Sequence, residues 1–182
     1  MKKTVLTFGL ISGILCSLMM VTTLPLADRI GFDRSMMVGY TTMVAAFLLV
    51  FFGIRSYRDN IAAGKITFVR AFTVGILITL ITCTFYVITW EILYFNFLHD
   101  FMDNYSAHLI QKAQNSGMSP AELQAKLAEI QRSKALYNHP LYNAAMTLLE
   151  PLPVGVIMTL ISAAILRRKS QSLSGQSSVA TS

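Results

Sequence analysis

Residues 68–97 read FVRAFTVGILITLITCTFYVITWEILYFNF, a run of thirty residues in which only Arg70 and Glu91 are charged. A helix that crosses a bilayer needs about 20 mostly apolar residues, so this run is long enough to span a membrane. Of the 182 residues, 54% are hydrophobic and 13% are charged, whereas about a quarter are charged in soluble domains. We therefore predict an all-α membrane protein with four transmembrane helices, at residues 4–26, 36–54, 68–97 and 141–166.

The amino terminus, Lys2 and Lys3 before an apolar run, also resembles the start of a signal peptide. The apolar part of a signal peptide has about 7–15 residues, and this run is longer. The stretch Pro25-Leu26-Ala27 lacks small residues at both positions that a cleavage site requires. We therefore expect an uncleaved first helix.

Basic residues lie at alternate ends of the apolar runs, which is the positive-inside pattern. With the amino terminus in the cytoplasm, the inner segments hold nine lysines and arginines and one acid, Asp59. The outer segments then hold six basic and eight acidic residues. This pattern predicts a multi-pass protein with both termini cytoplasmic, and it accounts for the net charge of +6 without a nucleic acid partner.

The segment 98–139 predicts an extracytoplasmic helical hairpin between spans three and four. The helical pattern of span three continues past the membrane, with Phe97, Phe101, Tyr105 and Leu109 four residues apart. A second helix begins at Ser119-Pro120-Ala121-Glu122, which has the pattern of a capping box with proline in the first turn. Its apolar face carries Leu123, Leu127 and Ile130. The tail, residues 170–182, is polar and serine-rich, so we expect it to be disordered and cytoplasmic.

Small residues in the first span, Gly9, Gly13 and Ser17, are four apart and allow another helix to approach closely. We expect this ridge to pack within the bundle, and the alternative is a homodimer face. The connection after the second span is basic, and Gly64 marks a turn in it. Its side chains either anchor the topology or contact anionic lipid headgroups; they are Arg55, Arg58, Lys65 and Arg70.

The fourth span contains Glu150-Pro151-Leu152-Pro153, and each proline removes a backbone donor. One interpretation is a helix from Leu141 with a kink near residues 147–153. The other is a span that starts at Pro151 and follows an interfacial segment at residues 141–149. We prefer the kinked helix, because residues 151–166 are short for a full span.

Two glutamates lie inside apolar runs, and counting from the outer ends places Glu91 and Glu150 at similar depths. Such a pair could share a proton or bind a cation, or each carboxylate could pair with Arg29 or Arg34. The simpler interpretation is that each glutamate reaches the outer interface separately, as Trp90 beside Glu91 suggests.

Other chemistry is weakly indicated. Cys16 and Cys83 lie within spans, so we expect neither a disulfide nor thiol chemistry. A metal site is not expected, because the nearby donors do not converge on one helical face; they are His99, Asp100, Asp103 and His108. No motif for a catalytic nucleophile or a phosphate loop occurs. We expect no enzyme activity and no cofactor.

Two groups of residues resemble a known family of bacterial membrane proteins. The first comprises Arg58-Asp59, Gly64-Lys65-Ile66-Thr67-Phe68, Ala71-Phe72 and Gly75. The second comprises Glu150 through Gly155 and Leu160-Ile161-Ser162-Ala163, followed by a basic end. The family is catalogued as domain of unknown function 4199, and the similarity covers most of residues 3–169. It implies a four-helix integral protein of the bacterial inner membrane and no particular activity.

These observations favour a non-enzymatic interaction or assembly component. The roughly forty residues between spans three and four are more than two spans need as a connecting loop. The lipid bilayer is the expected environment. The hairpin is the expected contact for a protein partner, and the first span is a possible homodimer contact. The alternative function is a small ion- or proton-coupled transporter, or a subunit of one, that uses Glu91 and Glu150.

Overall fold

The computed structural model describes residues 1–24 and 30–168, so the predicted tail at 170–182 lies outside the described residues. Nearly all of the described chain is helical. The helices are α1 (Lys2–Thr23), α3 (Phe32–Asn60), α4 (Phe68–Asn96), α5 (Phe101–Gln114), α6 (Pro120–Tyr137), α7 (Pro140–Leu148) and α8 (Pro151–Leu166).

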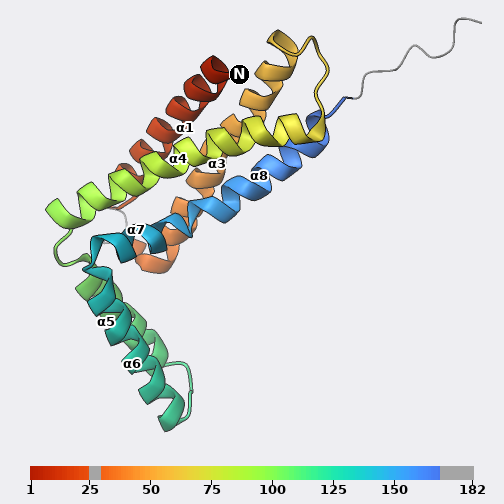
Figure 1. The fold of residues 1–182 in the computed structure, drawn as a ribbon. Helices are drawn as coiled ribbons and strands as arrows, with labels where there is room; N and C mark the ends of the chain where they lie inside the picture. Colours follow the sequence, from red (N-terminus) through yellow and green to blue (C-terminus); the bar gives the residue numbers. More distant parts are fainter. Residues whose placement is uncertain (25–29, 169–182) are drawn as a thin grey trace, which may run out of the picture.

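The bundle is built around α3 and α4, which contact each other, and both α1 and α8 pack against the two of them. The amino terminus, the α3–α4 connection and the end of α8 lie at one end of the bundle (Figure 1). We call this the termini end. The helices α5 and α6 lie side by side and project from the opposite end, which we call the hairpin end (Figure 1).

Four helical segments of the described residues are long and apolar enough to cross a membrane: Lys2–Thr23, Phe32–Asn60, Phe68–Asn96 and Pro140–Leu166. The faces of these helices that point away from the bundle are apolar as well. On α1, for example, Leu6, Leu10, Ile14 and Leu18 follow one another every four residues and are all exposed. A soluble bundle would bury such a stripe, whereas lipid solvates it. The prediction of an all-α membrane protein with four spans is confirmed.

The glycine ridge of α1 packs against α4. A Cβ atom at Gly9 would lie 2.9 Å from the Ile81 side chain, and one at Gly13 would lie 2.7 Å from the Phe85 ring. One turn further along, the hydroxyl groups of Ser17 and Thr89 form a hydrogen bond of 2.7 Å. The ridge therefore packs within the bundle, against α4. A homodimer contact through the first span stays a prediction.

A second close approach joins α4 to α8. The hydroxyl groups of Thr79 and Thr159 are fully buried and form a hydrogen bond of 3.0 Å. Gly155 lies beside this pair, where an added Cβ would be 2.7 Å from the Phe47 ring of α3. Small residues and paired hydroxyls are what helices use to associate in lipid, where apolar burial gives little driving force.

The helix ends differ from the sequence prediction in two places. The second span runs from Phe32 to Asn60 instead of 36–54, because the helix continues through polar residues that the apolar run does not count. The expected continuation of span three into the hairpin is wrong, since α4 ends at Asn96 and α5 begins at Phe101. The capping box at the start of α6 is confirmed, with the side chains and backbone N–H groups of Ser119 and Glu122 bonded reciprocally.

The fourth span is a kinked helix. Leu149 (φ −65°, ψ −16°) and Glu150 (φ −78°, ψ −60°) keep right-handed helical dihedrals between α7 and α8. Pro151 lacks the N–H group that would bond to the Thr147 carbonyl, which instead accepts a hydrogen bond of 3.4 Å from the N–H of Glu150. The preferred interpretation, a helix with a kink near residues 147–153, is confirmed.

The contact of α8 with α3 and α4 can be tested by filling the space at Gly155. We expect Gly155→Leu to lower the free energy of unfolding by about 1–3 kcal/mol, because the side chain would overlap the Phe47 ring. Gly39→Leu on α3 is the matched control, since a Cβ there would meet nothing within 4 Å. Thermal denaturation of both variants in a mild detergent measures the difference. Equal midpoints for the two would contradict the close packing of α8.

Candidate functional site

The hairpin-end half of α4 presents a row of aromatic residues. Tyr86, Trp90 and Tyr94 are four residues apart and therefore share one face of the helix. The Trp90 side chain lies at 5.1 Å from the ring of Phe101 in α5, and Tyr94 lies at 5.4 Å from the ring of Tyr137 in α6, both measured between ring centroids. This face of α4 therefore carries the base of the hairpin.

A buried asparagine links α4 to α7. The Oδ1 atom of Asn143 accepts hydrogen bonds from the indole N–H of Trp90 (2.8 Å) and from the Thr147 hydroxyl (3.2 Å). Its Nδ2 atom donates to the Tyr137 carbonyl at 3.2 Å. Asn143 is 0% exposed, so these three bonds replace the water that the amide loses on burial.

The hairpin is also attached to the start of α3. The Phe32 ring packs against Phe101 and Tyr105 of α5, at 6.1 and 5.7 Å between centroids. Beyond the rings, Asp33 Oδ1 lies 3.1 Å from the ammonium group of Lys112 and 3.5 Å from His108 Nε2. Aromatic contacts and an ion pair therefore attach the hairpin to two helices of the bundle.

A cavity of about 630 Å³ lies between α1, α3, α4 and α7 on the bundle side and the hairpin on the other. We call it the hairpin-end cavity. Its walls include six methionines and five tyrosines, together with Trp90, Phe32 and Phe101. The volume lies within the range of small-molecule sites, which are mostly apolar with a few polar groups that fix the ligand.

Glu150 lies on the wall of this cavity, at the kink between α7 and α8. The Tyr86 hydroxyl donates a hydrogen bond of 2.9 Å to Glu150 Oε2. The charge of Glu150 also reaches the hairpin. Burial and, next, the nearby negative charge of Glu150 raise the pKa of Tyr105 in α5. The kink thus places a carboxylate among tyrosines from two parts of the chain.

Glu91 has a different environment. Its Oε1 atom is buried and has no hydrogen-bond partner among the described residues. Glu150 is bonded to Tyr86, which precedes Glu91 by five residues, or about 7.5 Å along the helix. Tyr86 and Glu91 also point in directions that differ by about 140° around the axis of α4. Glu91 and Glu150 are therefore not hydrogen-bonded to each other in the described part of the chain, and their similar depth in a membrane stays a prediction.

The arginines considered as partners of these glutamates fall into two groups. Arg34 is exposed and forms no ion pair with Glu91 or Glu150 in the described part of the chain. Arg29 lies outside the described residues.

A family profile described as "Protein of unknown function (DUF4199)" matches residues 7–168. The chain belongs to the DUF4199 family. The resemblance identified from the sequence motifs is thus confirmed, although the family description assigns no activity. No curated protein and no solved structure matches the chain.

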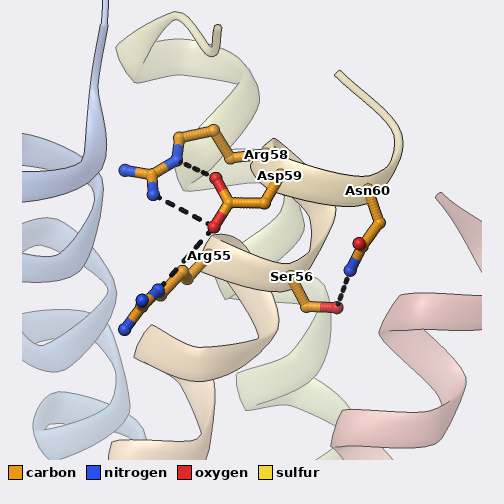
Figure 2. Close-up of polar contacts among 5 residues, drawn as sticks. All are labelled: Arg55, Ser56, Arg58, Asp59 and Asn60. Atoms are coloured by element: carbon orange, nitrogen blue, oxygen red, sulfur yellow. Dashed lines mark hydrogen bonds and ion pairs between the residues drawn. The ribbon is translucent and has the colours of Figure 1, made fainter. Parts of the chain in front are cut away.

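The first DUF4199 motif lies at the termini end, where Arg58 and Asp59 form a two-pronged ion pair. Arg58 Nε and Nη2 lie 2.6 and 3.2 Å from the two carboxylate oxygens of Asp59 (Figure 2). Arg55 Nε approaches the same carboxylate at 3.7 Å, and Asn60 bonds to Ser56 at 3.2 Å (Figure 2). Arg58 is mostly covered, with 12% of its side chain exposed, and the pair lies between neighbouring residues in the last turn of α3.

The rest of this DUF4199 motif connects α3, α4 and α8. Arg70 Nε donates a hydrogen bond of 3.0 Å to the buried Tyr57 hydroxyl. The N–H of Arg168 donates to the Ile66 carbonyl at 2.9 Å. Gly64 has a φ of +76°, a value that side chains disfavour, and it lies in the turn predicted from the sequence. The proposed contact of these basic residues with lipid headgroups stays a prediction; Arg55, Lys65 and Arg70 are exposed, and Arg58 is half-buried.

The remaining candidates are the two cysteines and the possible metal donors, and Cys16 is one of the residues that line the cavity. Cys16 and Cys83 are both free and buried. Among the possible metal donors, Asp103 pairs with Lys134 and His108 lies beside Asp33. Within residues 1–24 and 30–168, no group of three or more such side chains is arranged to hold a metal ion.

Two residues of the site in this DUF4199 chain are not predicted from the sequence. Asn143 is an amide inside the apolar segment 141–149, and a polar group in a span usually has a partner in another helix. That signal could have identified it. Tyr86 carries no such signal, because a tyrosine near a membrane interface is ordinary and its bond to Glu150 depends on the kink.

Replacing Asn143 tests the joint between α4 and α7. We expect Asn143→Ala to lower the free energy of unfolding by about 1–3 kcal/mol, because the buried N–H of Trp90 loses its acceptor. Asn104→Ala, on an exposed position of α5, is the control and should change the stability little. Tryptophan fluorescence during thermal unfolding reports both, since Trp90 is the chain's one tryptophan. An unchanged midpoint for Asn143→Ala would contradict this role.

Proposed function

We propose that this protein is a non-enzymatic interaction or assembly component of the bacterial inner membrane, and that α5 and α6 are its contact element. Both termini lie in the cytoplasm and the hairpin outside. The basic residues support this orientation. Lys2, Lys3, the Arg55–Arg70 connection and Arg168 all belong to the termini end, away from the hairpin (Figure 1).

The observation that carries the proposal is the way the hairpin is held. Met102, Ala113 and Ile130 are buried in the hairpin region, and Asp103 of α5 pairs with Lys134 of α6. The base is attached to α3 and α4 by the contacts of Phe32 and Trp90. A connection between two spans needs no such internal packing. A rigid element with a polar outer face is suited to recognition, because little ordering is lost on binding.

This role can be tested with two variants of the hairpin. The first deletes residues 100–137 and keeps both Tyr94 and Asn138, whose side chains are 3.1 Å apart at the base in the full chain. The second changes only exposed residues, Gln111→Glu, Gln124→Glu and Arg132→Glu, and leaves the cavity walls intact. After cross-linking in cells, we expect the unmodified chain to capture a specific protein that neither variant captures.

Thermal denaturation provides the control for this experiment. The surface variant must keep the unfolding midpoint of the unmodified chain, because its three changes lie outside the packed core. Identical captured proteins for all three chains would contradict the role of the hairpin.

A second candidate function is an ion- or proton-coupled transporter, or a subunit of one. The observation that favours it is Glu150, a carboxylate at a helix kink inside a span and on the wall of a cavity. Ionisable groups and broken helices inside membranes mark the binding sites of many transporters. Glu91 is outside the cavity lining, so this function would depend on Glu150 alone.

The transport hypothesis predicts a proton flux in proteoliposomes that depends on one carboxylate. We expect Glu150→Gln to abolish a cation-driven pH change, because glutamine has the shape of glutamate without its proton chemistry. Glu91→Gln should retain the flux. A dye that reports the internal pH measures both. Equal flux in Glu150→Gln and the unmodified chain would rule this candidate out.

A further inference from the structure

The hairpin-end cavity has an unusual balance of charge and apolar surface. Three of its lining residues have ammonium or carboxyl side chains: Lys126, Glu129 and Glu150. Lys126 Nζ lies 2.8 Å from Glu129 Oε2, so these two neutralise each other on α6. Glu150 lines the cavity and has no basic partner among the described residues. Within the described part of the chain, the cavity therefore carries one carboxylate that no basic side chain neutralises.

The groups around Glu150 are those that recognise organic cations. Tyrosine faces attract a cation through their quadrupole, and five tyrosines line the cavity. Tyr86 holds one carboxylate oxygen, Oε2, at 2.9 Å and thereby orients the group. The six methionines adapt to apolar bodies of different shape, because their side chains are flexible and polarisable.

Other occupants fit less well. A lipid chain would fill the apolar volume but would cover Glu150 without a partner, and burying an unpaired charge is costly. An organic anion would be repelled by the same carboxylate. A small inorganic cation would leave most of the 630 Å³ unfilled and would find one carboxylate where several oxygen ligands are needed.

We propose that the hairpin-end cavity binds a lipophilic organic cation, with Glu150 as its counter-ion and tyrosine rings around its apolar groups. Binding at this site does not depend on a partner of the hairpin surface. It also does not require that the bound cation be transported.

Two probes of the same shape and opposite charge provide the test. Tetraphenylphosphonium is a lipophilic cation and tetraphenylborate is its anionic counterpart. Isothermal titration of the full chain in an uncharged detergent measures both. We expect saturable binding of the cation at one site per chain, and no saturable binding of the anion. Equal binding of the two probes would overturn the proposal, because it would show an apolar site that is indifferent to charge.

Matched variants locate the site. Glu150→Gln keeps an acceptor for Tyr86 and should weaken cation binding by roughly tenfold or more. Glu150→Asp retains the charge and should restore part of the affinity. Glu91→Gln removes the other glutamate within a span, which is outside the cavity lining, and should leave the affinity within about twofold. Unchanged affinity in Glu150→Gln would overturn the proposal.

Gly39→Leu tests the site without altering its charge. Gly39 lines the cavity, and a Cβ there would meet nothing within 4 Å, so the leucine enters open space. We expect this variant to keep its fold and lose cation binding. It therefore decides the question even if Glu150→Gln fails to fold. Full binding in Gly39→Leu would place the cation elsewhere and overturn the proposal. Binding measured in detergent is independent of flux in liposomes and of captured partners, so failure here leaves those proposals standing.

Discussion

Close approach of helices to α4 is the interaction on which this bundle depends. In lipid, apolar side chains gain little by leaving their surroundings, so helices associate where backbones can come near one another. Gly9 and Gly13 of α1 provide one such contact, against Ile81 and Phe85. Gly155 of α8 provides the other, beside the Thr79–Thr159 hydroxyl pair. Both contacts are made with α4, so α1 and α8 pack closely against this helix.

The fourth span packs differently against α4 at the hairpin end. Pro151 and Pro153 interrupt the hydrogen bonding of the fourth span, and α7 contacts α4 through Asn143 and Trp90. Methionines and tyrosines line the cavity beneath the hairpin, between the helices. The kink that opens the space also places Glu150 on its wall.

The hairpin contributes an exposed outer surface and one wall of the hairpin-end cavity. Its base rests on aromatic rings from α3 and α4, and its own helices complete the far side of the cavity. A partner that moved the hairpin would therefore change the cavity, and a ligand in the cavity would contact the base of the hairpin. At the termini end, the Arg70–Tyr57 hydrogen bond joins α4 to α3, and the Arg58–Asp59 ion pair lies within α3.

The sequence by itself determined the fold class, the family, four spans and the two hairpin helices with their capping box. These features depend on local chemistry: the length of apolar runs, the prolines, and the Ser119–Glu122 spacing. It also placed the kink correctly, because proline acts on its own helix. Tertiary structure alone decided what each polar group contacts. Counting residues along separate spans left open whether Glu91 and Glu150 meet, and the structure shows that Glu150 accepts a hydrogen bond from Tyr86. The cavity likewise depends on how six helices pack, and no local pattern encodes the space between them.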